Sequence, residues 1–127
     1  MVLSFKEQFK EPILNGTKIH TIRTDQYDRW GVDATAHMAT GVRTPKYHCF
    51  KQARCTGKQA LTLIYDVNGF RALVDGIQLT PGRLLLLANN DGFEDTERLF
   101  LWFKSDILNS PKLMINRKII HWTDYRY

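Results

Sequence analysis

The segment from Gly16 to Arg23 reads Gly-Thr-Lys-Ile-His-Thr-Ile-Arg and brings an amine, an imidazole, a hydroxyl and a guanidinium together. A threonine hydroxyl is a poor nucleophile until a neighbouring base withdraws its proton, and a desolvated lysine amine is such a base. A guanidinium binds anions through its fork of N–H donors. Lys18, Thr21 and Arg23 are therefore the first candidates for a site, and we expect them to surround a cleft.

The geometry of an extended chain sets a condition on this site. Side chains alternate along a strand, so Thr21 and Arg23 would lie on one side and Lys18 and His20 on the other. Lys18 and Thr21 therefore meet only if the backbone bends, and Gly16 supplies backbone freedom just upstream. The alternative is that the two cations are ordinary solvated surface residues.

Two further regions suggest ligand contacts. Arg43 and Lys46 precede an aromatic, Tyr47, in an expected loop over 40–48, a pattern that suits a phosphate backbone and equally suits a solvated hairpin tip. Trp30 ends a polar segment over 24–31, where we expect it to lie in a cleft and stack against a base rather than in the core. The histidines lack a ligand spacing, so no metal and no cofactor is predicted.

Composition places the chain among ordinary globular proteins. With 127 residues, 43% of them hydrophobic, the chain suffices for one core, so we expect a single domain over 1–127. The net charge of +5 favours polyanionic partners such as RNA or nucleotides. The longest apolar run, 84–88, is too short to cross a bilayer, and charges interrupt the first fifteen residues, which together predict a cytoplasmic protein. Cys49 and Cys55 are expected to be buried or half-buried thiols.

The elements that must position the candidates follow from local patterns. We expect a helix over 5–14 with Pro12 at a kink or in a first turn, ended by Asn15-Gly16. Later segments favour other elements. We expect a strand or extended loop over 18–23, a strand starting in 32–38, strands within 49–65, a hairpin turning at Asp75-Gly76 and a strand over 113–122. A helix is expected over 82–89 after Thr80-Pro81, with a buried strand as the alternative. A second helix is expected to start at Asp95 or Thr96, with the apolar face Leu99, Leu101, Trp102 and Phe103. The sum is an α+β fold with a strongly curved, mainly antiparallel sheet.

A helix followed by Gly-x-Lys-x-x-Thr-x-Arg and then by strands resembles the ASCH family, whose fold is similar to the PUA domain of RNA-modifying proteins. Gly16, Lys18 and Arg23 match the family's loose signature. The Asn90-Asp91-Gly92-Phe93 stretch and the late Ile-Ile-His-Trp strand also look like this family. The resemblance implies a PUA-like curved β-barrel with flanking helices, and a cleft between the motif segment and the Asp91 loop.

One branch of the family resembles this chain more closely: bacterial amidohydrolases that remove the acetyl group of N4-acetylcytidine with a Lys, a Thr and a Glu. The resemblance implies Lys18 as the base, Thr21 as the nucleophile and Asp91 as the acid that protonates the leaving amine. Arg23 or backbone amides would stabilise the oxyanion. Asp91 is one methylene shorter than the family's Glu, and Glu94 is a possible substitute.

Three functions stay open from the sequence. The first is an ASCH domain that binds RNA or a modified nucleoside, with Gly16, Arg23, Trp30, Arg43 and Lys46 as binding residues. The second is the amidohydrolase. The third is a protein-interaction module without a nucleotide ligand.

Overall fold

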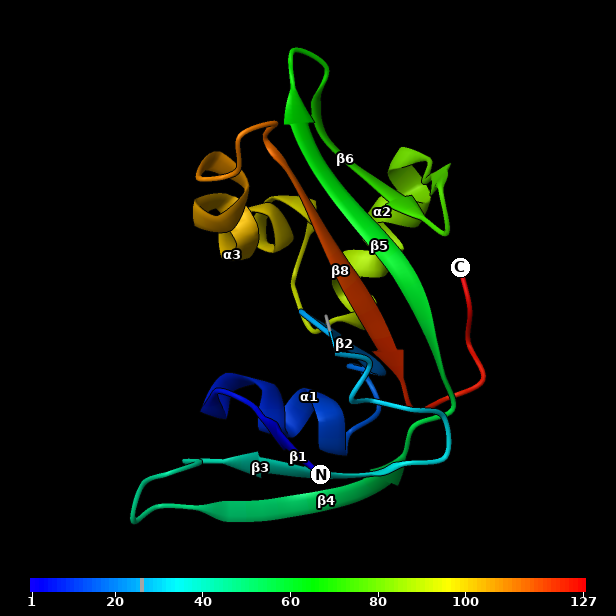
Figure 1. The fold of residues 1–127 in the computed structure, drawn as a ribbon. Coiled ribbons are helices and arrows are strands. Elements are labelled where there is room, and N and C mark those ends of the chain that lie inside the picture. The colour runs from blue at the N-terminus through cyan, green and yellow to red at the C-terminus, as the bar shows by residue number, and fades with distance from the viewer. Residues whose placement is uncertain (26) are drawn as a thin grey trace.

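The computed structural model describes residues 1–25 and 27–127, and its strands form two sheets (Figure 1). The strands are β1 (Val2–Ser4), β2 (His20–Arg23), β3 (Thr35–Thr40), β4 (His48–Arg54), β5 (Gly57–Asp66), β6 (Gly69–Val74), β7 (Ile77–Gln78) and β8 (Met114–His121). The helical segments are η1 (Glu7–Phe9), α1 (Lys10–Leu14), α2 (Pro81–Asn90) and α3 (Thr96–Leu108). The small sheet has the order β1-β3-β4 and the large sheet the order β2-β8-β5-β6-β7. The α+β class is thus confirmed, with two separate sheets and no closed barrel among the described strands.

In the large sheet, buried and more exposed side chains alternate along the strands. Along β5, Leu61 and Leu63 are buried while Thr62 and Ile64 are half-buried, as a strand with one covered face requires. The expected closing strand is β8, and it lies in the middle of the sheet, antiparallel to both β2 and β5. This register sets His121 directly opposite His20.

The helices begin where their caps predict. Thr80 accepts a hydrogen bond from the Arg83 amide with Pro81 in the first turn, and this confirms a helix rather than a buried strand. Asp95 caps α3 through the Arg98 amide at 2.8 Å. The predicted apolar face of α3 was partly wrong. It buries Leu99, Phe103 and Ile107 at intervals of four residues and leaves Leu101 and Trp102 about half exposed.

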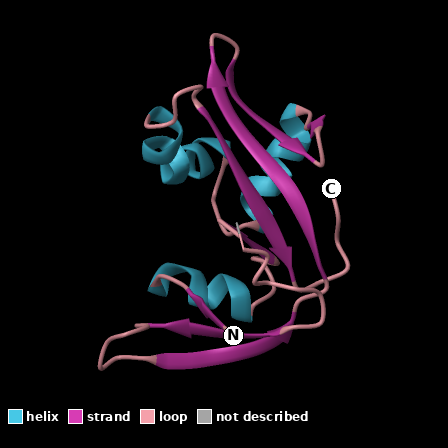
Figure 2. Ribbon diagram, in the orientation of Figure 1, coloured by secondary structure: helices cyan, strands magenta, loops and turns pink. Residues whose placement is uncertain are grey.

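The amino-terminal segment departs from the predicted long helix. Residues 2–4 pair in parallel with β3, and only a 3-10 turn and the short α1 follow. Pro12 lies in the first turn of α1, where its missing N–H costs nothing. Figure 2 shows α1 between the small sheet and the large one, so the segment preceding Lys18 connects the two.

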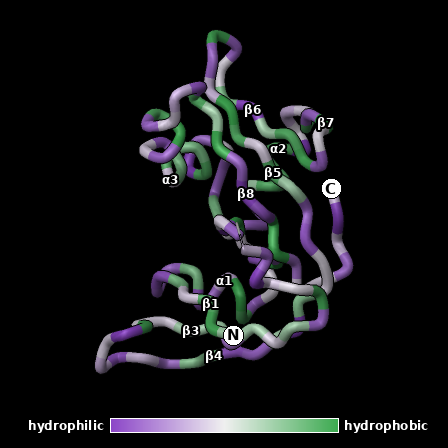
Figure 3. The backbone as a smooth tube through the Cα atoms, viewed as in Figure 1, coloured by the Kyte–Doolittle hydropathy of each residue, from purple (hydrophilic) through white to green (hydrophobic). Residues whose placement is uncertain are grey.

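One cluster of buried residues spans both sheets, from Leu3 and Met38 to Leu63 and Ile119. The polar turn between β3 and β4 lies outside it and is coloured hydrophilic in Figure 3. The loop predicted over 24–31 contains no helix or strand in its described part, and residue 26 lies outside the described residues. No helix in the described part of the chain is long and apolar enough to cross a membrane.

Candidate functional site

A turn after α1 supplies the bend that the motif needs. Gly16 adopts a φ of +84°, in the left-handed region that glycine tolerates best. The amide of Lys18 then donates to the Pro12 carbonyl, and the amide of Ile19 to the Asn90 carbonyl. Lys18 therefore lies before the start of β2. Its side chain does not follow the alternation between the two faces of that strand, which places Thr21 and Arg23 on the same face. Gly16 itself is exposed and shapes the turn without bordering the pocket.

A cavity of about 310 Å³ opens beside this segment. Its wall combines polar groups of the motif with aromatic rings from the amino-terminal segment and from α3 and the loop that precedes it. The lining residues are Ser4, Phe5, Lys6, Phe9, Lys18, Thr21, Ile22, Arg23, Asp91, Phe93, Trp102 and Phe103. The structure thus brings Lys18, Thr21, Arg23 and Asp91 to one cavity, as the sequence predicts.

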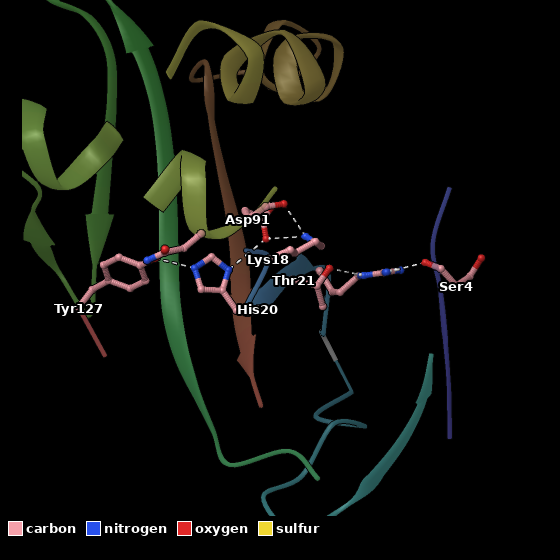
Figure 4. A network of polar contacts seen from close by, with 8 residues as sticks. Ser4, Lys18, His20, Thr21, Asp91 and Tyr127 are labelled. Carbon is pink, nitrogen blue, oxygen red and sulfur yellow. Dashed lines mark hydrogen bonds and ion pairs between the residues drawn. The ribbon is translucent and has the colours of Figure 1, made fainter. Parts of the chain in front are cut away.

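Lys18 and Asp91 form a buried ion pair (Figure 4). The Lys18 Nζ donates to the backbone carbonyl of Asp91 at 2.6 Å and to its Oδ1 at 3.1 Å, and the two side chains are 2% and 5% exposed. The ammonium also lies 4.8 Å from the centre of the Phe9 ring, a cation–π distance. Burial lowers the pKa of Lys18, although the Asp91 carboxylate opposes this shift.

Asp91 reaches the pocket because α2 ends there. The Asp91 amide donates to the Leu87 carbonyl at 3.0 Å, and Gly92 follows with a φ of +92°. A Cβ on Gly92 would lie 3.1 Å from both the Lys18 Cδ and the Phe9 Cδ1. Glycine is therefore required at position 92 by conformation and by space.

Thr21 and Arg23 share one face of β2, as alternation predicts. The Arg23 Nε donates to the Thr21 Oγ1 at 3.1 Å, and its NH2 nitrogen donates to the Ser4 carbonyl at 2.5 Å. The guanidinium stacks 4.9 Å from the Phe5 ring, and burial lowers the pKa of Arg23. Because the Thr21 hydroxyl accepts from Arg23, its own proton remains available to a base or a ligand.

His20 lies behind the pocket and is fully buried. Its Nδ1 lies 3.1 Å from the Asp91 Oδ1, and its Nε2 lies 2.6 Å from the Tyr127 Oη. The Asn90 Nδ2 donates to the same phenol oxygen at 3.0 Å. Burial lowers the pKa of His20, so the ring stays neutral near pH 7.

The other predicted binding residues lie elsewhere. Trp30 is 8% exposed in the core cluster, which corrects the expectation of a cleft position; it comes from a polar loop, but its ring is covered by core residues. Arg43 and Lys46 are exposed in the turn between β3 and β4 and do not line the pocket. Glu94 is exposed as well and does not line it. Of these two carboxylates, Asp91 is the one that lines the pocket.

The aromatic part of the wall is not predicted from the sequence. Phe5 and Phe9 lie in the segment for which a helix is expected, and Trp102 is expected on the apolar face of another helix. The Lys6 Nζ lies 5.2 Å from the Trp102 ring at the edge of the pocket, and Phe9 and Trp102 meet edge to face at 5.3 Å. The sequence signal for this wall was a lysine directly after an aromatic residue, as in Phe5-Lys6 of the amino-terminal segment and Phe103-Lys104 of α3.

The described residues contain no cluster of three or more His, Cys, Asp or Glu side chains that could hold a metal ion. Cys49 is half-buried, Cys55 is buried, and both are free thiols, as predicted.

No family model, no curated protein and no solved structure matches this chain. The resemblance to the ASCH family therefore rests on the sequence motif, and what it implies is put forward below as a proposal.

Proposed function

We propose that this chain is an ASCH-type domain with a PUA-like fold whose pocket binds a modified nucleoside. The observation that carries the proposal is the convergence of buried Lys18, Thr21 and Asp91 and half-buried Arg23 on one cavity with aromatic walls. Two sheets that share one core support a PUA-like fold, since a strongly curved sheet can separate into two.

The size and chemistry of the pocket favour a single nucleoside. Its volume of about 310 Å³ lies at the lower end of the range of roughly 300–1,000 Å³ for small-molecule sites. Aromatic rings such as Phe5 and Trp102 suit a base, which stacks on side chains of this type. The donors of buried Lys18 and half-buried Arg23 suit the carbonyl oxygens that a modified pyrimidine presents.

The basic arm formed by β3, β4 and their turn supports the proposal that the bound nucleoside is part of an RNA strand. The stretch 34–65 contains five Lys and Arg and no acidic residue, a charge equal to the net +5 of the whole chain. Arg54 pairs with Asp33, and Lys58 with Asp25 and Asp28. Arg43, Lys46 and Lys51 have no acidic partner among the described residues and suit phosphate groups.

Calorimetric titration with N4-acetylcytidine and cytidine tests the binding proposal. We expect the acetylated nucleoside to bind and Arg23→Gln to weaken binding at least tenfold, because hydrogen bonds to a charged donor contribute roughly 1.5–3 kcal/mol. Arg29→Gln, in the exposed loop after β2, is the matched control and should bind like the unaltered protein. Equal affinities of the two variants would count against this pocket.

A second function is favoured by one specific observation: the three groups of an acyl-transfer mechanism border the same cavity. Lys18 offers a base, Thr21 a nucleophile whose proton is available, and Asp91 an acid. We therefore propose, as the second candidate, that the chain hydrolyses the N4-acyl amide of the bound nucleoside.

The proposed steps conserve protons if Lys18 and Asp91 share one proton between them. In the proposed reaction the pair starts with its proton on Asp91, as an amine on Lys18 and a carboxylic acid on Asp91, and burial promotes this transfer by lowering the pKa of Lys18. The Thr21 Oγ1 attacks the acyl carbon, its proton passes to Lys18, and the Arg23 guanidinium stabilises the oxyanion. The C–N4 bond then breaks and Asp91 protonates N4. Water hydrolyses the acyl ester, returning a proton to Asp91 while Lys18 returns one to Thr21.

Chromatography for free cytidine after incubation with N4-acylated cytidines tests this candidate. Thr21→Ala should abolish turnover while retaining binding, because it removes the nucleophile and little of the wall. Thr24→Ala, one residue beyond β2 and exposed, is the matched control. Full turnover by the Thr21→Ala variant would refute the assignment, and binding without turnover in the unaltered protein would leave the binding function alone.

A further inference from the structure

The two carboxylate oxygens of Asp91 have different surroundings. Oδ1 faces both the Lys18 Nζ and the His20 Nδ1, each at 3.1 Å. Oδ2 has no hydrogen-bond partner within the described part of the chain, and it is not among the buried polar atoms left unsatisfied. Since Asp91 borders the pocket, Oδ2 is the oxygen left for a ligand.

One arrangement of protons satisfies the polar atoms that link Asp91 through His20 to Tyr127. Burial raises the pKa of Tyr127, so its phenol keeps its proton, and the Asn90 amide already donates to its oxygen. The His20 Nε2, 2.6 Å away, is the acceptor that the described residues offer to the phenol proton, so we assign the phenol as the donor. A neutral imidazole carries one proton, which then lies on Nδ1 and is donated to the Asp91 Oδ1.

Hydrogen bonds from the large sheet to the Tyr127 backbone hold this residue in place. The Gln59 side chain accepts from the Tyr127 amide at 3.0 Å and donates to the Tyr127 carbonyl at 3.1 Å. The His121 Nε2 lies 3.0 Å from the same Gln59 Oε1. Residues from β5, β8 and the last turn of α2 thus fix Tyr127 against His20, although the two are 107 positions apart in the sequence.

We propose that His20, held in its Nδ1–H form by Tyr127, is a positioning residue that directs the acidic proton of Asp91 to Oδ2. This proposal rests on the amidohydrolase proposed above, in which Asp91 protonates the leaving nitrogen. With Nδ1–H and Lys18 both donating to Oδ1, a proton on Asp91 finds room only on Oδ2. The opposite tautomer would present a lone pair to Oδ1 and draw the proton away from the pocket.

Tyr127→Phe and its control Tyr125→Phe test this role. Each removes one phenol oxygen from the same segment, and only Tyr127 bonds to His20. We expect Tyr127→Phe to lower kcat for N4-acetylcytidine about tenfold with KM nearly unchanged, a part of the roughly 10²–10⁴-fold that general acid–base catalysis contributes. Tyr125→Phe should keep the kcat and KM of the unaltered protein.

A spectroscopic measurement separates this inference from the proposed function. Long-range ¹H–¹⁵N correlation on protein labelled in its histidines, with His20→Gln to assign the signals, reports which ring nitrogen carries the proton. We expect Nδ1–H at His20 in the unaltered protein and in Tyr125→Phe, and a mixture or Nε2–H in Tyr127→Phe. Nε2–H in the unaltered protein, or equal kcat in the two tyrosine variants, overturns the inference. Absence of any turnover together with the expected tautomers refutes the amidohydrolase and supports the hydrogen-bond assignment.

Discussion

Lys18 and Asp91 hold opposite charges where water solvates neither of them. Such a pair is costly to bury, and its partners depend on each other: removing one leaves the other without compensation. Here the dependence is strong because Lys18 is 2% exposed and its remaining neighbours include the rings of Phe5 and Phe9. Burial lowers the pKa of Lys18, which is what the proposed proton transfer within this pair requires.

A double-mutant cycle measures this coupling. Lys18→Met should lower the free energy of unfolding by about 3 kcal/mol, because it leaves a buried carboxylate unpaired. Asp91→Asn should also destabilise the protein, and the double variant should be more stable than the sum of the two by about 1 kcal/mol or more. Urea unfolding gives all four values. The exposed pair of Arg54 and Asp33 is the control, and Arg54→Met should change stability by less than about 1 kcal/mol. Strict additivity at Lys18 and Asp91 would contradict the coupling.

Some residues of the site could be predicted from their spacing in the sequence, and others could not. Lys18, Thr21 and Arg23 are close in sequence, so their residue types and the adjacent glycine were enough to select them. His20 and Tyr127 meet only because β8 pairs with β2 and carries the following segment back, and no local pattern encodes that pairing. Trp30 shows the converse, since a polar sequence neighbourhood did not prevent a buried ring.

At the scale of elements, the junction between α2 and α3 decides where the acid lies. Caps made this junction predictable: Thr80-Pro81 begins α2, Asp91-Gly92 ends it and Asp95 begins α3. The parallel pairing of β1 with β3 was not predictable, because Val-Leu-Ser is too short to distinguish a strand from the start of a helix. The predicted hairpin at Asp75-Gly76 is present, since its turn chemistry is local.

Gly92→Ala tests the close packing at this junction. Position 92 has a φ of +92°, and the added Cβ would contact the Lys18 Cδ and the Phe9 Cδ1 at 3.1 Å. Gly69→Ala is a matched control, because its φ of +89° imposes the same strain with nothing within 4 Å. We expect Gly92→Ala to cost about 1 kcal/mol more in urea unfolding than Gly69→Ala and to weaken nucleoside binding as well. Equal stability and unchanged binding would show that Lys18 is not confined in this way.

At the scale of the whole molecule, charge is divided between two regions. The pocket pairs its buried cations with Asp91 or with aromatic rings, whereas the basic arm leaves Arg43, Lys46 and Lys51 exposed or half-buried. Lysines on an edge strand also discourage sheet-to-sheet aggregation, so Lys51, on the edge strand β4, has a structural role too. Only the salt dependence of binding separates that role from recognition of a phosphate backbone.

The double variant Arg43→Gln/Lys46→Gln isolates the contribution of the arm. If these residues contact phosphates, the slope of log K against log salt for single-stranded RNA should decrease by about 1.4, or roughly 0.7 for each contact. Arg98→Gln/Lys104→Gln removes the same charge from exposed positions on α3 and should leave the slope unchanged. Equal slopes in the two double variants would indicate attraction by net charge alone.

The buried histidines make the stability of the whole molecule depend on pH. Burial lowers the pKa of His121 to about 3 and also lowers the pKa of His20. The unfolded chain binds protons at these residues below about pH 6.5, while the folded chain keeps them neutral. Stability is therefore complete above pH 6.5 and falls as the pH decreases toward 3, because protons favour the unfolded state in that window.

Thermal unfolding between pH 7 and pH 4.5 checks this dependence. We expect His121→Gln to reduce the slope of the unfolding free energy with pH by up to about 1.4 kcal/mol per pH unit, the value for one proton. His48→Gln, at an exposed position, should leave the slope unchanged. Proton NMR of the imidazole signals gives a second reading that does not require a stable variant: the His121 ring should show no titration above pH 4.5. A His121 signal that titrates near pH 6.5 would mean that the ring reaches water, and the packing of β8 against Tyr127 would then be looser than the structure has it.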